Sequence, residues 1–183
     1  TLSGSNASGD GGAIVNNGAL TIVDSTLSGN TSTSDGGAIS TTASATTLTL
    51  INTTISGNTA AGSGGGIEVL GGTVASINTT ITNNSADSDN NSLGDGGGIK
   101  VQAGTVTLKN TIVAGNFNED GASDAADDIG GSTVDPSSSF NLIGTGGAGG
   151  LTNGVNNNQV GVASPGLGPL ANNGGKTQTH ALL

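Results

Sequence analysis

Four oxygen-bearing side chains in one polar insertion have the types and spacing that could hold a metal ion. Asp87, Asp89 and Asn91 recur at alternate positions, and Asp95 follows a few residues later. Oxygen ligands at alternate positions are typical of the start of a calcium loop, but the glycine and glutamate that an EF-hand places sixth and twelfth are absent. The sequence therefore offers Asp87, Asp89, Asn91 and Asp95 as a calcium candidate, and a solvated acidic loop is the alternative.

A second acidic insertion spans residues 119–128. Its five acids are Glu119, Asp120, Asp124, Asp127 and Asp128. Both insertions fall where the sequence repeat lengthens, and solenoid proteins place exposed decoration at such points. The same two interpretations, calcium site or solvated loop, apply here.

Side chains that could catalyse a reaction are scarce. The chain has three lysines, one histidine, no arginine and no cysteine. His180 has neither a cysteine nor a nearby acid in sequence, so it predicts neither a catalytic triad nor a metal site. Lys100 and Glu68 occupy equivalent repeat positions, which we interpret as an exposed ion pair worth about 0–1 kcal/mol. We therefore expect no enzymatic activity.

Composition excludes several classes of partner. Thirteen acids against three lysines give a net charge of −10. Phosphate backbones and anionic membranes require cationic surfaces, so neither nucleic-acid binding nor membrane association is expected. No apolar run approaches the roughly 20 residues of a membrane-spanning helix, which also argues against direct membrane insertion.

The elements that must position these side chains are revealed by a repeated motif. The segment 52–58, with the sequence NTTISGN, recurs in variant form at 24–30, 78–84 and 110–116, and its end at 1–5. The equivalent apolar positions, separated by 25, 28, 26 and 32 residues, are Leu2, Leu27, Ile55, Ile81 and Val113. Self-similarity at this period is typical of a solenoid.

Each repeat contains three short strand signals. The first follows a glycine pair, the second alternates apolar and polar residues, and the third is the motif itself. Dense glycine and the lack of a 3.6-residue apolar stripe exclude a helical solenoid. The sequence predicts an all-β, right-handed, single-stranded parallel β-helix of about five coils of 25–32 residues.

Stacking of the coils predicts columns of equivalent side chains. One apolar column comprises Ile14, Ile39, Ile67, Ile99 and Ile129, and two polar columns comprise Asp24, Asn52, Asn78 and Asn110, and Asn30, Asn58, Asn84 and Asn116. Stacked asparagines can hydrogen-bond from coil to coil. A further column, Asp10, Asp35, Ser63 and Asp95, would place carboxylates one coil apart. A shared cation or turn hydrogen bonds must then relieve their repulsion, and turn bonds are the commoner answer.

The repeat degrades after residue 116, and a strand signal returns at 140–143. We divide the chain into β-helix repeats at 1–144 and a Gly/Asn/Pro-rich C-terminal cap segment at 145–183 within the same domain. A cap is expected because an uncovered last coil would expose strand edges. The first residues lie within a repeat, so we interpret the chain as a piece of something longer, with an open first coil.

Two parts of the chain resemble known families. The motif at 20–30 and the Gly-Gly-Ala-Ile sequences resemble bacterial right-handed β-helix surface proteins, including the polymorphic outer-membrane protein type and pectate-lyase-like solenoids. The tail, through residues 140–144, 156–161, 168–170 and 172–183, resembles the choice-of-anchor Q domain of secreted bacterial surface proteins. These resemblances imply export to the cell surface or release from it, and no known catalysis.

The functional expectation is a non-catalytic extracellular β-solenoid with a structural or adhesive role, either a stiff spacer or a fibre-forming subunit. Expected partners are further copies of the chain, stacked end to end, and cell-surface glycans. The alternative is a carbohydrate-active or glycan-binding β-helix of the pectate-lyase-like kind. A minor third reading is ice binding, because threonines recur outward on the second strand, where threonine is in any case favourable.

Overall fold

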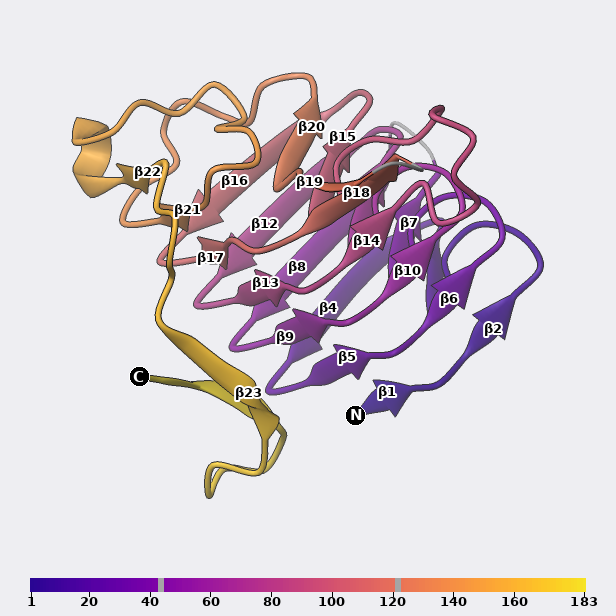
Figure 1. The fold of residues 1–183 in the computed structure, drawn as a ribbon, viewed down its shortest axis with the longest axis horizontal. Helices are drawn as coiled ribbons and strands as arrows, with labels where there is room; N and C mark the ends of the chain where they lie inside the picture. The colour runs from indigo at the N-terminus through magenta and orange to yellow at the C-terminus, as the bar shows by residue number, and fades with distance from the viewer. Residues whose placement is uncertain (43–44, 121–122) are drawn as a thin grey trace.

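The chain winds into a parallel β-solenoid, which confirms the predicted fold class (Figure 1). The computed structural model describes residues 1–42, 45–120 and 123–183. Equivalent strands of successive coils pair in parallel to form four sheets, which we call sheets A to D.

The motif strands form sheet A, and the strands that follow them form sheet B. In spatial order, sheet A contains β1 (Leu2–Ser3), β5 (Thr26–Ser28), β9 (Thr54–Ser56), β13 (Thr80–Thr82), β17 (Ile112–Val113), β21 (Leu142–Ile143) and β22 (Gln159–Val160). Sheet B contains β2 (Asn6–Ala7), β6 (Thr31–Ser32), β10 (Thr59–Ala60), β14 (Ser85–Ala86), β18 (Phe117–Asp120) and β19 (Ser123–Ala126).

The strands after the glycine pairs form sheet C, and the alternating strands form sheet D. Sheet C contains β3 (Ile14–Asn16), β7 (Ile39–Thr41), β11 (Ile67–Val69), β15 (Ile99–Val101) and β20 (Ile129–Gly131). Sheet D contains β4 (Ala19–Val23), β8 (Thr47–Ile51), β12 (Thr73–Ile77) and β16 (Thr105–Lys109). A 3-10 helix, η1 (Val155–Asn157), and an antiparallel hairpin of β23 (Leu167–Ala171) and β24 (Thr179–Leu182) complete the described elements.

The predicted registers are confirmed strand by strand. In sheet A, Ile55 lies between Leu27 and Ile81, as the repeat requires. In sheet C, the predicted isoleucine column pairs in sequence from Ile14 to Ile129. The sequence predicted three strands per coil, and the structure adds the two-residue strands of sheet B. Two residues are too few for alternation to be visible in the sequence.

The core is a narrow column of aliphatic side chains. Leu27, Ile55 and Ile81 are fully buried, and no aromatic side chain belongs to the core of the described chain. The glycine pairs allow the coils to approach closely at one corner. A Cβ on Gly37 would lie 2.2 Å from the carbonyl oxygen of Gly65 in the next coil, and Gly36 has a φ of 68°. Only glycine fits both requirements.

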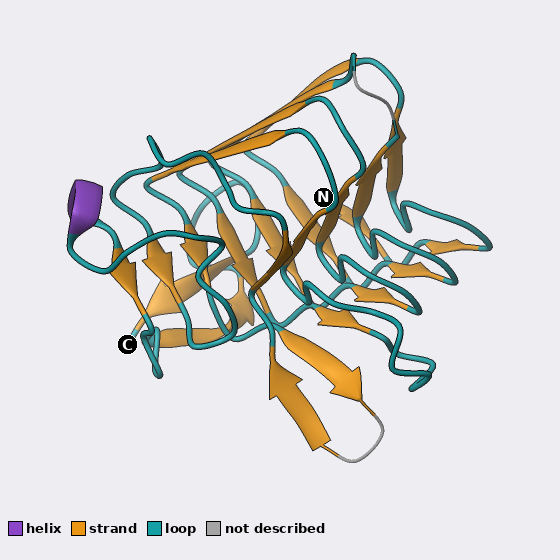
Figure 2. Cartoon of the chain, turned by 90° about the horizontal axis from the view of Figure 1, so that it is seen from above, coloured by secondary structure: helices purple, strands orange, loops and turns teal. Residues whose placement is uncertain are grey.

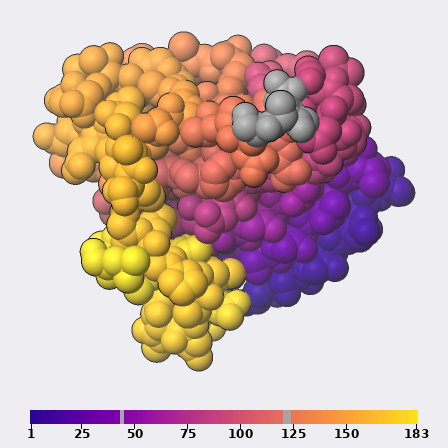
Figure 3. Space-filling view, viewed as in Figure 1, coloured from indigo at the N-terminus to yellow at the C-terminus, as the bar shows by residue number. Residues whose placement is uncertain are grey.

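The C-terminal part of the chain covers the last coil and then turns back. Val134 and Leu151 join the buried core at this end, and β22 extends sheet A beyond residue 144. The chain then runs back along the coils to the β23–β24 hairpin (Figures 1 and 3). The hairpin lies on the outer face of sheet A, where the Thr26 hydroxyl donates to the Gln178 carbonyl at 2.7 Å. The tail therefore contacts its own coils at both places.

The second acidic insertion forms a projecting antiparallel hairpin, β18–β19. Figure 2 shows it standing out from the stacked coils. β19 lies at the edge of sheet B and reverses the strand direction there. Residues 121–122, between the two strands in sequence, lie outside the described part of the chain.

Candidate functional site

The first predicted calcium ligands lie in a loop whose carboxylates already accept hydrogen bonds. Asp87 is fully buried. Its Oδ1 accepts the backbone N–H of Asn91 at 3.2 Å, and its Oδ2 accepts that of Ser92 at 3.0 Å. The Asn91 amide donates in turn to Asp89 at 2.9 Å. The loop is therefore organised by its own backbone donors.

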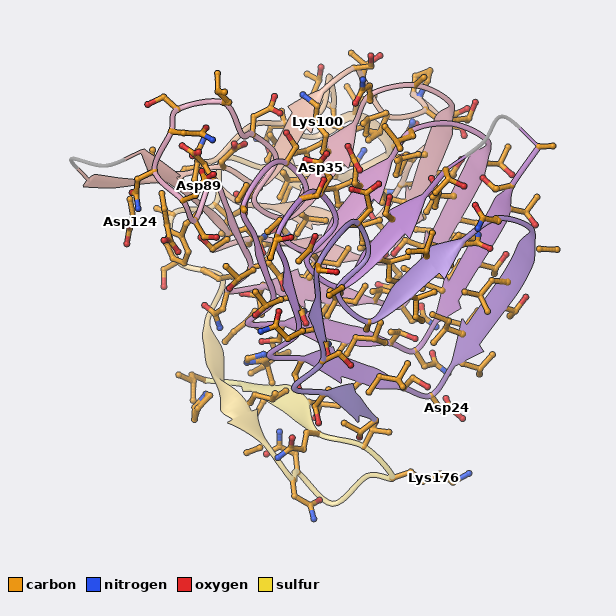
Figure 4. All side chains as sticks on the ribbon, turned by 90° about the vertical axis from the view of Figure 1, so that its right-hand side faces the viewer. Asp24, Asp35, Asp89, Lys100, Asp124 and Lys176 are labelled. Carbon is orange, nitrogen blue, oxygen red and sulfur yellow. The ribbon has the colours of Figure 1, made fainter. Side chains whose placement is uncertain are left out.

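Asp95, the fourth predicted ligand, faces a different set of partners. Its Oδ1 accepts the Ser63 hydroxyl at 3.2 Å and forms an ion pair with the ammonium group of Lys100. Among the described residues, no three His, Cys, Asp or Glu side chains form a group suited to a metal ion. Calcium binding by Asp87, Asp89, Asn91 and Asp95 stays a prediction. Figure 4 shows Asp89 and Asp124 on segments that project from the same side of the solenoid.

The acids before the glycine pairs accept backbone N–H groups from the turn of a neighbouring coil rather than from their own turn. The backbone N–H of Asp35 donates to Asp10 at 3.4 Å, and that of Ser63 donates to Asp35 at 2.6 Å. Asp127, whose backbone is in register with Gly97, lies beside the column that these acids form, and its Oδ2 accepts the Gly96 N–H at 2.7 Å. Burial, and then the neighbouring acids, raise the pKa of Asp127. Backbone donors thus relieve the repulsion between coils.

Glu68 corrects the interpretation of an exposed ion pair. The register opposite Lys100 is confirmed, but Glu68 is only 1% exposed. The preceding turn lies close to the outer face of sheet C, since a Cβ on Gly64 would be 2.9 Å from the Glu68 Cα. The Ser40 hydroxyl donates to Glu68 Oε2 at 3.3 Å. Lys100 pairs with Asp95 instead. Burial, with smaller contributions from the negative charges of Asp35 and Asp10, raises the pKa of Glu68 to about 7.

His180 has a structural environment. Its Nδ1 donates to the Gly168 carbonyl at 2.7 Å, across the β23–β24 hairpin. In the neutral ring, Nε2 is then the acceptor for the Ser56 hydroxyl at 2.9 Å. His180 therefore fastens the hairpin to β9. Lys176 lies at the hairpin tip and points away from the coils (Figure 4).

The threonine ranks on sheet D follow the predicted register. One outward rank contains Ala19, Thr47, Thr73 and Thr105, and the next contains Thr21, Thr49, Ala75 and Thr107. Ice binding by this face stays a prediction. The adjacent outward rank, Val23, Ile51 and Ile77, is apolar. The hairpin of the tail lies on sheet A, and Val23 remains 47% exposed.

A groove on the outer face of sheet A was not predicted from the sequence. It has a volume of about 640 Å³ and lies beyond the part of the sheet that the hairpin covers. Its outward side chains include Thr80, Ile112, Leu142 and Gln159 from four successive strands, and Leu182 borders it from the hairpin. None of its lining residues is charged. The absence of charge is notable in a chain with a net charge of −10.

Phe140 forms one wall of this groove and interrupts the exposed polar column. The corner residues Asp24, Asn52, Asn78 and Asn110 have φ values of 46–52°, and Phe140 follows them with a φ of 58°. The phenyl ring is 56% exposed. The sequence signal was an aromatic residue 30 positions after Asn110, in a column otherwise made of Asn and Asp.

Comparison with known proteins gives one family match. Residues 24–42 and 52–69 match the model of the Chlamydia polymorphic membrane protein repeat. Both segments contain the uninterrupted run from the sheet A strand to the sheet C strand, and the longer coils that follow carry the insertions. The match supports a surface-associated β-helix similar to these proteins. Neither a curated protein nor a solved structure gives a significant match.

The described residues contain no helix that is long and apolar enough to cross a membrane.

Proposed function

We propose that this chain is a non-catalytic, extracellular structural or adhesive β-solenoid that acts as a stiff spacer at the cell surface. The match to polymorphic membrane protein repeats supports a place at the surface. The resemblance of the tail to anchor domains supports retention there. The observation that carries the proposal is the continuous ladder of buried side chains linking successive coils.

That ladder runs through Asn30, Asn58, Asn84 and Asn116. Each amide donates to the next side chain at 2.8–2.9 Å, and Asn116 donates to Asp128 at 3.0 Å. All five side chains are at most 1% exposed. A coil that separated from its neighbour would leave buried donors and acceptors unpaired, at a cost of about 1–3 kcal/mol for each group. Bending or opening the stack is therefore unfavourable at every step.

The side-chain chemistry favours a spacer over the pectate-lyase-like alternative. Lys100 and His180 are engaged in an ion pair and a hairpin contact. A lyase or hydrolase needs a free base or a pair of acids aimed into a substrate groove. The groove on sheet A has neither among its lining residues.

The test has two measurements on the full chain. Incubation with polygalacturonate and neutral polysaccharides should give no new reducing ends and no unsaturated products. Digestion with a broad-specificity protease should cut the projecting hairpins and leave the stacked coils intact. Polysaccharide cleavage, or rapid digestion within the coils, would contradict the proposal.

Self-association end to end is part of the same proposal. The first-coil strands lie at open edges of all four sheets, and Leu2 is 46% exposed. Unpaired strand edges are templates for other strands. At the opposite end β19 reverses direction and Val134 and Leu151 close the core, so the two ends differ, and contact between unlike ends would give an open filament rather than a closed dimer. Negative-stain images should show linear particles that lengthen with concentration, whereas monomers at every concentration would exclude assembly.

A further inference from the structure

We propose that the groove on the outer face of sheet A binds an uncharged, hydroxyl-rich glycan chain, with Phe140 as its stacking platform. The inference rests on the adhesive part of the proposed function and supplies the class of ligand. It is carried by three observations: the conformation of Phe140, the free polar groups around it and the absence of charge in the groove.

Phe140 occupies a backbone position that suits asparagine better. The left-handed region is unfavourable for a bulky side chain, whereas Asn and Asp tolerate it. An asparagine here would also extend the exposed ladder by donating one more hydrogen bond, to the free Oδ1 of Asn110. Phe140 has neither the tolerance for this backbone conformation nor a ladder hydrogen bond, and it gains little burial, since it is 56% exposed. A strained residue of this kind indicates a functional requirement.

The interruption leaves polar groups free at the groove. The exposed ladder ends at Asn110, whose amide donates to Asn78 at 2.8 Å. Its Oδ1 accepts no hydrogen bond from the described residues. The side chains of Asn157 and Gln159, both exposed, also form no hydrogen bond with the described protein. Amides of this kind both donate and accept, which suits the hydroxyl groups of a sugar.

The apolar part of the lining complements the carbon-bound face of a sugar ring. Ile112 and Leu142 are half-buried on the sheet, and Phe140 and Leu182 stand exposed at its margins. An aromatic face beside polar groups is typical of sites that orient a ligand with one apolar side. A lipid acyl chain, which has neither donors nor acceptors, would leave the Asn157 and Gln159 amides buried without partners, which disfavours that occupant.

The absence of charge selects the kind of glycan. No lysine or arginine lines the groove to bind a uronate or a sulfate, and the chain as a whole carries a charge of −10. An acidic polysaccharide would be repelled. An uncharged chain laid across β13, β17, β21 and β22 would meet equivalent positions one strand apart, at intervals of about 4.8 Å.

The experiment is native affinity electrophoresis of the full chain in gels that contain dextran, a soluble β-glucan or a galactomannan, with polygalacturonate as the acidic comparison. At least one neutral polysaccharide should slow the protein. Phe140→Asn should lower the affinity for that polysaccharide, measured from the retardation, at least tenfold. Its melting temperature should be equal or higher, because asparagine tolerates the left-handed backbone conformation at this position. Leu93→Asn, which changes an 82% exposed leucine in a different loop, is the matched control and should bind normally.

Gln159→Ala provides a second variant that alters an exposed side chain, and it should weaken binding several-fold. The proposal is overturned by no retardation in any neutral gel, by retardation only with polygalacturonate, or by unchanged binding of Phe140→Asn. It is equally overturned if Phe140→Asn instead abolishes self-association, since the groove would then be an interface between copies. A chain that binds no glycan but resists protease and cleaves no polysaccharide would fail this inference alone and leave the spacer role intact.

Discussion

Two polar ladders run along the solenoid, and they differ in burial and in direction. The exposed ladder links Asp24, Asn52, Asn78 and Asn110 by side-chain hydrogen bonds of 2.8–3.1 Å. The buried ladder links Asn30, Asn58, Asn84, Asn116 and Asp128 at 2.8–3.0 Å. The distances are nearly the same, so geometry alone does not separate the two ladders.

The direction of each ladder follows from its single carboxylate. An ionised carboxylate only accepts hydrogen bonds, so the amides must donate towards it. Asp24 lies at the N-terminal end of the exposed ladder and Asp128 at the C-terminal end of the buried one, and the amides accordingly point in opposite directions. One consequence is the free Oδ1 of Asn110 beside the groove.

Burial separates the two ladders energetically. Each buried asparagine also bonds the backbone, as when the Asn58 amide donates to the Leu27 carbonyl at 3.1 Å and its Oδ1 accepts the Asn30 N–H at 3.0 Å. Losing such a side chain leaves buried groups unpaired, whereas water replaces the bonds of the exposed ladder. The comparison teaches that a repeated residue in one motif can serve stability at one position and backbone conformation at another.

The largest expected loss of stability comes from a substitution in the apolar core between the two ladders. Ile55 lies between Asn52 and Asn58 and is fully buried between Leu27 and Ile81. Ile55→Ala should lower the free energy of unfolding by about 2–5 kcal/mol, because it leaves a cavity in a narrow core. Denaturant unfolding measures the loss, and Thr49→Ala on sheet D is the control and should change almost nothing. An unchanged stability for Ile55→Ala would reject the register.

A substitution that breaks the buried ladder should cause a comparable loss of stability. Asn58→Ala removes the acceptor of the Asn30 N–H and the donor to the Leu27 carbonyl. We expect a loss of about 2–4 kcal/mol in the free energy of unfolding, since several buried groups lose their partners. A loss below that of a typical surface substitution would show that the ladder does not hold the coils together.

Glu68 adds a pH dependence to the stability of the fold. Its pKa, raised from 4.5 to about 7 by burial and by Asp35 and Asp10, means that the folded chain binds more protons than the unfolded chain between pH 4.5 and 7. Stability should therefore fall as the pH rises through this window. Glu68→Gln should flatten the fall and stabilise the protein at pH 8 by up to about 3 kcal/mol.

The measurement is thermal unfolding of both proteins from pH 4 to pH 8. The two curves should converge near pH 4, where Glu68 is protonated in the folded and the unfolded states. Asp127 has a pKa raised in the same direction and should leave a smaller slope in the variant. Parallel curves would place Glu68 in contact with solvent and contradict its burial.

The solenoid and its ladders could be predicted because the same motif recurs in each coil. Aligning the copies of the motif gives the register of the strands. Glu68 could not be placed, because its burial depends on a turn that lies close to the outer face of sheet C. The hairpin contact between Ser56 and His180 joins residues 124 positions apart, and no local pattern encodes it. The groove was missed for the same reason. Its signal, Phe140 in an asparagine column, acquires meaning only once the tail is placed.

Substitutions of Asn52 should separate the contribution of backbone conformation to stability from that of side-chain hydrogen bonding. Its φ is 50°, which glycine adopts freely and alanine does not. Asn52→Gly should cost less than about 1 kcal/mol, and Asn52→Ala should cost about 1 kcal/mol more. Equal losses in denaturant unfolding would show that the exposed side-chain bonds matter more than the turn.

The smallest expected effect concerns the predicted calcium loop. Asp87 accepts two backbone N–H groups, and Asp95 is paired with Lys100. We therefore expect a chelator to leave the melting temperature unchanged, and Asp89→Asn to behave as wild type. A chelator-dependent fall that Asp89→Asn reproduces would establish calcium as a ligand of this loop.

The central claim, that the buried ladder locks neighbouring coils together, is tested most directly by residue-resolved hydrogen exchange of the unaltered protein. The backbone N–H groups of Asn58 and Asn84 donate to ladder side chains, whereas that of Asn52 donates to the Ile77 carbonyl at the exposed corner. The account predicts that the Asn58 and Asn84 amides exchange only through global unfolding, while the Asn52 amide exchanges faster through local opening. Exchange of the Asn58 amide as fast as that of Asn52 would contradict it.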